Sequence, residues 1–357
     1  MAAQPVIAAI KSPALRASKV ATFRNLRVLS WNNKTLYVSR GYQVLAAEPE
    51  HSFIWREVGS FPAQWRLLTS QNRLTSRLVR DGFHALAVPP CGNLVAAVPG
   101  AIVTLAPGEK KFRVTHRIIR GTRPLHITAT PDGRLCWGEY FGNPNRDAVH
   151  IYASDDGGAT WAIAYTFPAR SIRHIHNIVY DRWANCLWVF TGDYGRECRI
   201  LRTSLDLSAM EEILAGDQQA RAVAAIADED GLYFASDTPL ERNYISHLDR
   251  RGNLRKLATI SSSSIYGCRN RAGLFFSTMV EPSEVNASND VRLYSSETGN
   301  EWNVLASWRK DRWPMKLFQY GNAFLPDGEN QTDFLAASTI AVGGADLQTT
   351  IWRTSTP

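Results

Sequence analysis

Cysteine is scarce in this chain, and its few thiols follow no metal-site or redox spacing. The five cysteines are odd in number, and no Cys-x-x-Cys pair occurs. Four of them lie inside or beside apolar runs, which favours buried free thiols over a disulfide framework. The five are Cys91, Cys136, Cys186, Cys198 and Cys268.

Long apolar runs and long basic runs are also missing. No stretch approaches the ~18 apolar residues of a membrane span. Near the N-terminus the only apolar run is 6–10, which Lys11 interrupts and no basic residue precedes, so it makes a poor signal peptide. We therefore expect a cytoplasmic protein without a membrane span. Without a Lys/Arg run we expect no nucleic-acid partner, although the net charge of +7 favours anionic partners in general.

What the chain does contain is a repeated pattern of short strands. Its 11 Trp, 12 Tyr and 14 Phe suit half-buried sheet surfaces, and no long helical period occurs. An apolar strand, a glycine-containing turn, a second strand, a loop and two further strands recur roughly every 40–50 residues, as in propeller blades. The repeats cover about 22–61, 80–119, 123–168, 172–214, 220–260, 263–308 and 316–354.

These repeats predict an all-β protein, a seven-bladed β-propeller forming one domain over 1–357. Six blades is the alternative if one repeat is misread. The last repeat supplies only three strands, so we expect residues near 4–21 to add the fourth. A ring closed by such an N-terminal strand would leave no exposed sheet edge.

One turn has a distinctive sequence. Residues 154–161 read Ser-x-Asp-x-Gly-x-Thr-Trp, and altered copies occur at 204–206 and 295–302. Asp and Ser can bond their own main chain, Gly permits unusual backbone angles, and Thr and Trp resume the strand. We expect this segment to close a hairpin, with Asp156 bonded to its own turn.

The same residues resemble the Asp-box (BNR repeat) of sialidase-like superfamily propellers. The resemblance implies a propeller fold and carbohydrate-directed activity. The Arg-Ile-Pro motif of sialidases is absent, and sialidases have six blades. The chain is loosely similar to seven-bladed glycosidases and uronate lyases, which use His, Tyr and Arg and in some cases a metal held by histidines.

Blade topology predicts which loops share a face. Starts of first strands and ends of second strands should meet around the mouth of the central channel, opposite the hairpin turns. Acids, imidazoles, guanidiniums and phenols concentrate there, as in sites built on rigid scaffolds. The first-strand positions are His84, Arg123, His126, Arg173, His174, His176, Arg221, Tyr266, Arg269, Gln319 and Tyr320. The second-strand positions are Glu139, Tyr140, Asp193, Tyr194, Asp237 and Glu281.

Three histidines occupy matching positions in consecutive repeats. His84, His126 and His176 each begin a first strand, so they could point into one layer of the channel and hold a divalent metal. The alternative is that each histidine bonds backbone or the neighbouring blade. Glu139 and Asp237 are likewise equivalent, and either form an acid/base pair or act as counterions to Arg123, Arg173 and Arg221.

Together these patterns favour a carbohydrate-active propeller that binds and cleaves a glycan or oligosaccharide by hydrolysis or by elimination, and they favour an acidic glycan over a neutral one. The expected catalytic residues are His174, His176, Glu139, Tyr140 and Asp193. The expected substrate-binding residues are Arg123, Arg173, Arg221, Tyr194, Asp237, Tyr266, Gln319 and Tyr320. The alternative is a non-catalytic sugar-binding or assembly scaffold, for example in polysaccharide synthesis.

Overall fold

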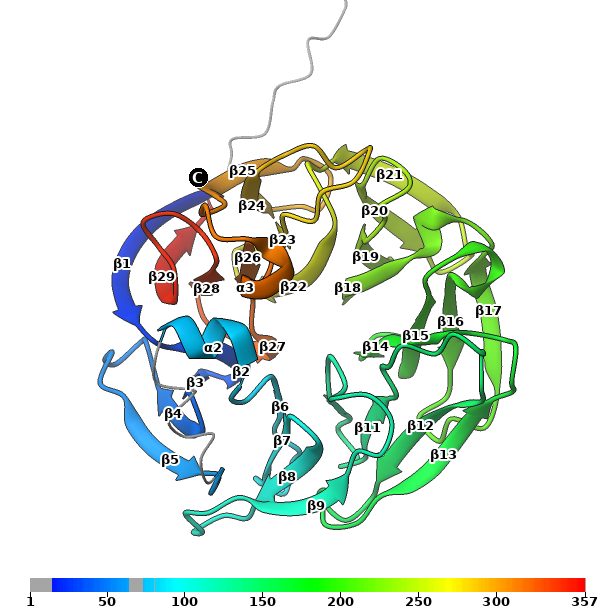
Figure 1. Ribbon diagram of the computed structural model, residues 1–357, viewed down its shortest axis with the longest axis horizontal. Helices are drawn as coiled ribbons and strands as arrows, with labels where there is room; N and C mark the ends of the chain where they lie inside the picture. Colours follow the sequence, from blue (N-terminus) through cyan, green and yellow to red (C-terminus); the bar gives the residue numbers. More distant parts are fainter. Residues whose placement is uncertain (1–14, 64–72, 80, 357) are drawn as a thin grey trace, which may run out of the picture.

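The computed structural model describes residues 15–63, 73–79 and 81–356 and shows seven sheets arranged in a ring around a central channel (Figure 1). Six sheets have four strands and one has five. The predicted seven-bladed β-propeller is therefore confirmed. Within the described residues no helix is long and apolar enough to cross a membrane.

Most blades are built from four consecutive strands running from the channel to the rim. Blade 1 holds β2 (Arg27–Asn33), β3 (Thr35–Arg40), β4 (Gln43–Ala47) and β5 (Arg56–Ser60). Blade 2 holds β6 (Ala85–Ala87), β7 (Leu94–Val98), β8 (Ala101–Leu105) and β9 (Arg113–Arg117). Blade 3 holds β10 (Thr128–Ala129), β11 (Leu135–Gly138), β12 (Val149–Ser154) and β13 (Ala162–Phe167).

The next three blades continue in the same order. Blade 4 holds β14 (His174–Asp181), β15 (Cys186–Gly192), β16 (Arg199–Thr203) and β17 (Met210–Ala215). Blade 5 holds β18 (Ala222–Asp228), β19 (Gly231–Ser236), β20 (Tyr244–Asp249) and β21 (Leu254–Thr259). Blade 6 holds β22 (Ser264–Asn270), β23 (Gly273–Thr278), β24 (Asp290–Ser296) and β25 (Asn303–Arg309).

The last blade joins the two ends of the chain. It contains β26 (Asn322–Phe324), β28 (Phe334–Ile340), β29 (Gln348–Ser355) and, at the rim, β1 (Arg16–Arg24). β1 pairs antiparallel with β29, from Arg16 opposite Ser355 to Arg24 opposite Gln348, and the two strands lie side by side in Figure 1. The predicted closure by an N-terminal strand is confirmed. The expected range of 4–21 differs in its bounds, because β1 extends to Arg24 and residues 4–14 lie outside the described residues.

A second link across the closure lies in the channel wall. β27 (Asp327–Asn330) leaves blade 7 and pairs in parallel with β2 of blade 1, with Asp327 opposite Ser30. It makes that sheet five-stranded, and Figure 1 shows β27 next to β2 on the side that faces the centre of the ring.

The cores lie between blades, where the alternating apolar residues of neighbouring sheets meet. One such core packs Trp188 and Phe190 of blade 4 against Phe234 of blade 5. The cysteines follow the prediction: all five are free, Cys91 is exposed, and the other four are buried.

The predicted hairpin turn at 154–161 bonds its own backbone. Asp156 Oδ1 accepts from the Ala159 and Thr160 amides at 3.0 and 2.9 Å, and its Oδ2 accepts from Thr160 Oγ1 at 2.6 Å. Ser154 Oγ donates to the same carboxylate at 2.7 Å. These bonds tie Asp156 to the turn on the hairpin face, away from the first-strand starts.

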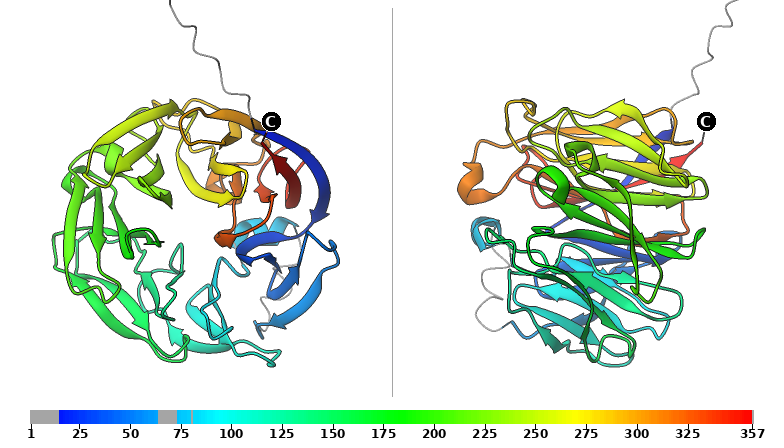
Figure 2. Two further views of the ribbon diagram at one scale, coloured as in Figure 1. Left: turned by 180° about the vertical axis from the view of Figure 1, so that it is seen from behind. Right: turned by 90° about the vertical axis from the view of Figure 1, so that its right-hand side faces the viewer.

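Two short helices stand on the other face. α2 (Arg73–Val79) precedes blade 2 and α3 (Met315–Phe318) precedes blade 7, and both lie on one side of the disc (Figure 2, right). The buried guanidinium of Arg77 joins them, because it donates to Phe318 O at 2.7 Å and pairs with Asp311. The repeat pattern predicted neither helix, since both are insertions in loops between blades.

Candidate functional site

Two imidazoles and one carboxylate meet at the channel end of blade 4, and we call His174, His176 and Asp193 the histidine–aspartate cluster. The Nε2 atoms of the two histidines lie 3.0 Å apart, and each lies 3.3 Å from Asp193 Oδ1. All three side chains are buried. The histidines begin β14 and Asp193 follows β15, so the shared face inferred from topology is confirmed for this group.

Strand pairing explains why the cluster forms. His174 pairs with Gly192, the residue before Asp193, so the start of β14 lies beside the end of β15. The register shifts between Ile175 and Asn177, which makes His176 a bulge residue. A bulge re-aims a side chain, and here both imidazoles lie next to one another with their ring centroids 4.9 Å apart.

Two arginines and a second carboxylate extend the cluster toward blade 5. Arg173 Nη1 donates to Asp193 Oδ2 at 3.0 Å. Arg221 Nη2 lies 3.4 Å from Asp193 Oδ1 and 3.5 Å from Asp237 Oδ2, so it bridges the two acids. The Nε atoms of both arginines are buried and have no hydrogen-bond partner among the described residues. Such orphaned donors could be satisfied by the oxygens of an anionic ligand.

Electrostatics gives the two aspartates opposite protonation states. Burial alone would raise the pKa of Asp193, but polar contacts with the two imidazoles outweigh it and hold the pKa well below its usual range. Burial raises the pKa of Asp237 to about 7, with Arg221 opposing and Glu281 reinforcing the shift. Near pH 7 Asp193 is thus ionised while Asp237 is partly protonated. Two carboxyls whose pKa values are shifted in opposite directions are typical of acid/base sites.

The neutral groups of the site are a histidine and a tyrosine. Burial lowers the pKa of His176 to about 4, so its imidazole is uncharged at pH 7. Tyr140 covers the cluster, with its ring centroid 4.4 Å from that of His174. Burial, together with the charges of Asp237 and Asp193, raises the pKa of Tyr140 to about 12. Its hydroxyl therefore acts as a donor at neutral pH and not as a base.

Glu139 has a different environment from the one predicted. Its carboxylate accepts from Arg120 Nε at 3.0 Å and from the His150 amide at 2.8 Å, and it also pairs with Arg120 Nη2. The counterion is thus Arg120, and none of the three arginines considered from the sequence. A carboxylate with these contacts stabilises the end of blade 3 and lies outside the histidine–aspartate cluster.

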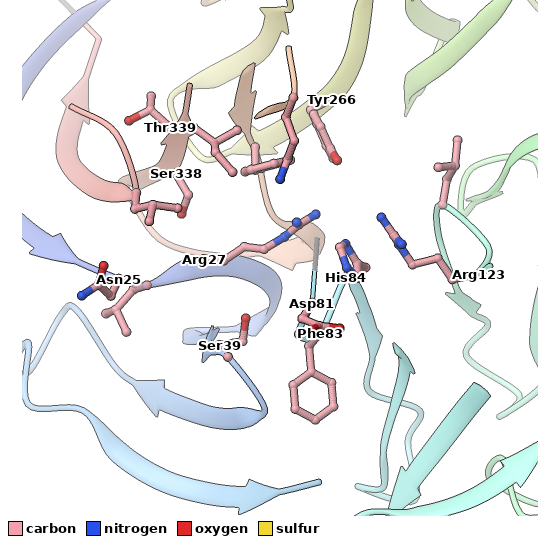
Figure 3. A pocket seen from close by; sticks show the side chains of 18 of the residues that line it. Asn25, Arg27, Ser39, Asp81, Phe83, His84, Arg123, Tyr266, Ser338 and Thr339 are labelled. Carbon is pink, nitrogen blue, oxygen red and sulfur yellow. The ribbon is translucent and has the colours of Figure 1, made fainter. Parts of the chain in front are cut away.

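A second group of polar residues lines a cavity of about 190 Å³ on the other side of the channel mouth. Figure 3 shows Arg27, His84 and Arg123 directed toward one another, with the Tyr266 hydroxyl facing the same space. Gln319 also lines it, while its Nε2 donates to Arg77 O at 2.9 Å. We call Arg27, His84, Arg123 and Tyr266 the arginine pocket.

The predicted three-histidine metal set is wrong. His84 lies in the arginine pocket, and His126 Nδ1 lies 3.0 Å from both carboxylate oxygens of Asp327. Among the described residues, the group whose ligand atoms lie within 4.8 Å of one another is His174, His176 and Asp193. The matching positions in consecutive repeats do not bring the three histidines together, because each belongs to a different blade and has different neighbours.

Three further predicted positions are separate from both groups. Tyr194 and Tyr320 are 46% and 37% exposed, and neither lines the cavity. Arg269 lies on the opposite face, because it is next to the end of β22 and pairs with Asp228, the last residue of β18. The sequence pattern predicted Arg269 at the start of this first strand, and that prediction was wrong because Arg269 lies near the strand's other end.

Sequence reasoning missed several residues of this face. Arg27 begins β2 and could have been found by the same first-strand rule that gave His84. Arg120 and Asp327 could not have been found by that rule, because Arg120 lies in a loop and Asp327 begins β27, a strand that the repeat pattern did not predict. Ser262 and Ser264 were also missed, and their hydroxyls are buried without a partner among the described residues.

Fold and site together define a seven-bladed propeller with a buried, polar, acid/base-capable cluster at one channel mouth. The chain matches no protein-family model and no curated protein. It is similar in structure to a catalytically inactive histidine-to-alanine variant of virginiamycin B lyase from Staphylococcus aureus, with quinupristin, at a TM-score of 0.60, 13% identity, and coverage of 95% of this chain and 99% of that one. It is also similar to a chain of the mitotic checkpoint complex, at a TM-score of 0.58, 10% identity and 99% coverage of both chains. At such identities the likeness shows the fold alone.

Proposed function

We propose that the protein is a carbohydrate-active enzyme that binds an acidic glycan at the channel mouth and cleaves it at the histidine–aspartate cluster. One observation carries this proposal: two imidazoles and an ionised carboxylate converge in a buried site, flanked by two arginines with orphaned Nε donors. Basic groups beside guanidiniums suit a substrate that bears a carboxylate near the bond to be broken.

Elimination is the reaction that uses these groups best. Arg173 and Arg221 bind the uronate carboxylate and so acidify the neighbouring C–H bond. The cluster takes that proton, the adjacent carbon–oxygen bond breaks, and a carbon–carbon double bond forms. Asp237, whose pKa is about 7, donates a proton to the leaving oxygen. A lyase with a similar fold is catalytically inactive as a histidine-to-alanine variant, which supports this class of chemistry.

Hydrolysis is the second candidate, and the opposite pKa shifts of Asp193 and Asp237 favour it. An ionised and a protonated carboxyl, bridged by Arg221, are the two groups that glycoside hydrolysis needs. The products distinguish the two reactions. Elimination yields an unsaturated sugar that absorbs ultraviolet light, whereas hydrolysis incorporates oxygen from labelled water.

The test is incubation of the protein with uronic-acid oligosaccharides, followed by ultraviolet absorbance and mass spectrometry of the products. His176→Ala should abolish turnover while melting stays close to that of the native protein. Arg173→Lys should mainly raise KM, because the two-pronged guanidinium donor is lost. Arg182→Lys is the matched control, since Arg182 is exposed and pairs with Glu329 outside the cluster. Binding without turnover of any such substrate would favour the non-catalytic scaffold instead.

A further inference from the structure

The hydrogen bonds of the two clustered histidines fix which ring nitrogen carries hydrogen. His174 Nδ1 lies 3.0 Å from Phe141 O, and His176 Nδ1 lies 3.1 Å from Ala222 O. A backbone carbonyl only accepts, so each Nδ1 must be the donor. In a neutral imidazole the other nitrogen, Nε2, then carries a lone pair and no hydrogen.

The Nε2 atoms of both rings lie at the same place. The two Nε2 atoms lie 3.0 Å apart, and both lie 3.3 Å from Asp193 Oδ1. Three potential ligand atoms thus converge in a buried site. A cation placed among the three atoms would contact all of them at once.

We propose that the histidine–aspartate cluster binds one divalent transition metal ion of the zinc class through His174 Nε2, His176 Nε2 and Asp193 Oδ1. Zinc bonds nitrogen at about 2.0–2.1 Å and carboxylate oxygen at about 2.0–2.2 Å, which places tetrahedral ligand atoms about 3.3 Å apart. The observed separations of 3.0, 3.3 and 3.3 Å fit that shell. Imidazole nitrogens favour zinc and its neighbours over calcium or magnesium, which prefer oxygen.

The surroundings support the ligands in the way that metal sites require. Each Nδ1–H bond to a carbonyl orients its ring, as in the outer shell of known metal-binding histidines. Asp193 is held from two sides, by Arg173 at Oδ2 and by Gln218 Nε2, which donates to Asp193 O at 2.9 Å. Three protein ligands also leave a fourth position for water or substrate, which is the arrangement of catalytic zinc.

Charged groups of both signs surround the cluster. Arg173 and Arg221 are the cations in contact with Asp193, and Asp237 is the second acid in contact with Arg221. Two positive and two potentially negative groups therefore surround the site, so a divalent ion does not enter a strongly positive field.

The ion's role in catalysis rests on the proposed function, whereas its binding does not. A bound ion would lower the pKa of a coordinated water toward ~7, and the resulting hydroxide could take the proton from the substrate. The histidines would then act as ligands rather than as the base. Mutation of either histidine would still abolish cleavage.

The experiment is a metal titration of the chelator-treated full-length protein, which requires no substrate. Calorimetry with Zn²⁺, and visible absorption with Co²⁺ as a spectroscopic probe, should each show one ion per chain. Asp193→Asn, His174→Gln and His176→Gln should each weaken binding by more than the roughly 10–100-fold that loss of an outer-shell partner costs. His150→Gln is the matched control, because His150 contacts Thr166 outside the cluster and should leave the affinity unchanged.

Two results would overturn the metal site. One is no Zn²⁺ or Co²⁺ uptake by the native protein, a measurement that does not depend on whether any variant folds. The other is uptake that survives all three ligand substitutions. Cleavage without metal uptake would refute the metal site and leave the proposed function standing. Metal uptake without cleavage would support the metal site and refute the proposed function.

Discussion

At the residue scale, the two aspartates that share Arg221 show how position decides chemistry. Asp193 contacts two imidazoles and two guanidiniums, so its carboxylate stays ionised although it is buried. Asp237 pairs with Arg221 at the longer distance of 3.5 Å and lies near Glu281, so burial dominates and raises its pKa to about 7. The same residue type is thereby prepared for two roles.

The raised pKa of Asp237 predicts how stability depends on pH. An unfolded Asp titrates near 3.9, whereas burial raises the pKa of Asp237 to about 7 in the folded protein. Between these values the folded state binds the extra proton, so this group's contribution to stability is lost as pH rises from about 4 to 7. Asp237→Asn should remove that loss, which is on the order of a few kcal/mol.

Urea unfolding at pH 5 and pH 8 measures the effect. The native protein should lose more stability than the Asp237→Asn variant over that interval. Asp230→Asn, at an exposed carboxylate on the β18–β19 turn, is the control and should follow the native protein. An equal pH dependence in all three proteins would contradict the raised pKa.

At the element scale, the conspicuous sequence motif at 154–161 has a structural role, because it closes a hairpin turn. Asp156 accepts three hydrogen bonds from Ala159 and Thr160, and a fourth from Ser154. We predict that Asp156→Ala lowers the free energy of unfolding by about 1–3 kcal/mol, since two turn amides and two hydroxyls lose their acceptor. Activity per folded molecule should not change, because the turn lies on the face opposite the cluster.

Chemical denaturation checks this prediction, with the neighbouring Asp155→Ala as the control. Asp155 forms a surface ion pair with Arg134 at 3.1 Å, which should contribute less than about 1 kcal/mol. If Asp156→Ala abolished activity and left stability intact, the turn would be part of the site after all.

The same scale shows what the sequence could and could not predict. Strands, turns and blade order depend on local alternation and glycine turns, so seven blades and a common face for His174, Asp193 and Arg221 could be predicted. Contacts across the channel depend on the angle between blades, which no repeat length contains. The partner of His126 is Asp327 on β27, and the partner of Glu139 is Arg120 in a loop, so both pairings were beyond the pattern.

At the scale of the whole molecule, the ring is closed by segments from both ends of the chain. β1 completes blade 7 at the rim, and β27 joins blade 7 to blade 1 in the channel wall. Leu15, just before β1, is buried with Cys268 and Phe275 of blade 6. Closure therefore connects blades 6, 7 and 1, and the arginine pocket spans this closure because Arg27 and Tyr266 lie on either side of it.

The rim strand can be tested by comparing two truncations. Removal of residues 1–14 leaves β1 and all described contacts in place, whereas removal of 1–24 exposes the whole edge of β29. We predict that the protein with the longer truncation melts on the order of 10 °C below the one with the shorter truncation. Loss of the β1–β29 pairing should cost several kcal/mol of stability, and each kcal/mol lowers the melting temperature by about 2 °C. An open edge should also promote association between chains. Added peptide 15–24 should restore the melting temperature by strand addition. Equal melting of the two truncated proteins would show that β27 and the cores between blades hold the ring without β1.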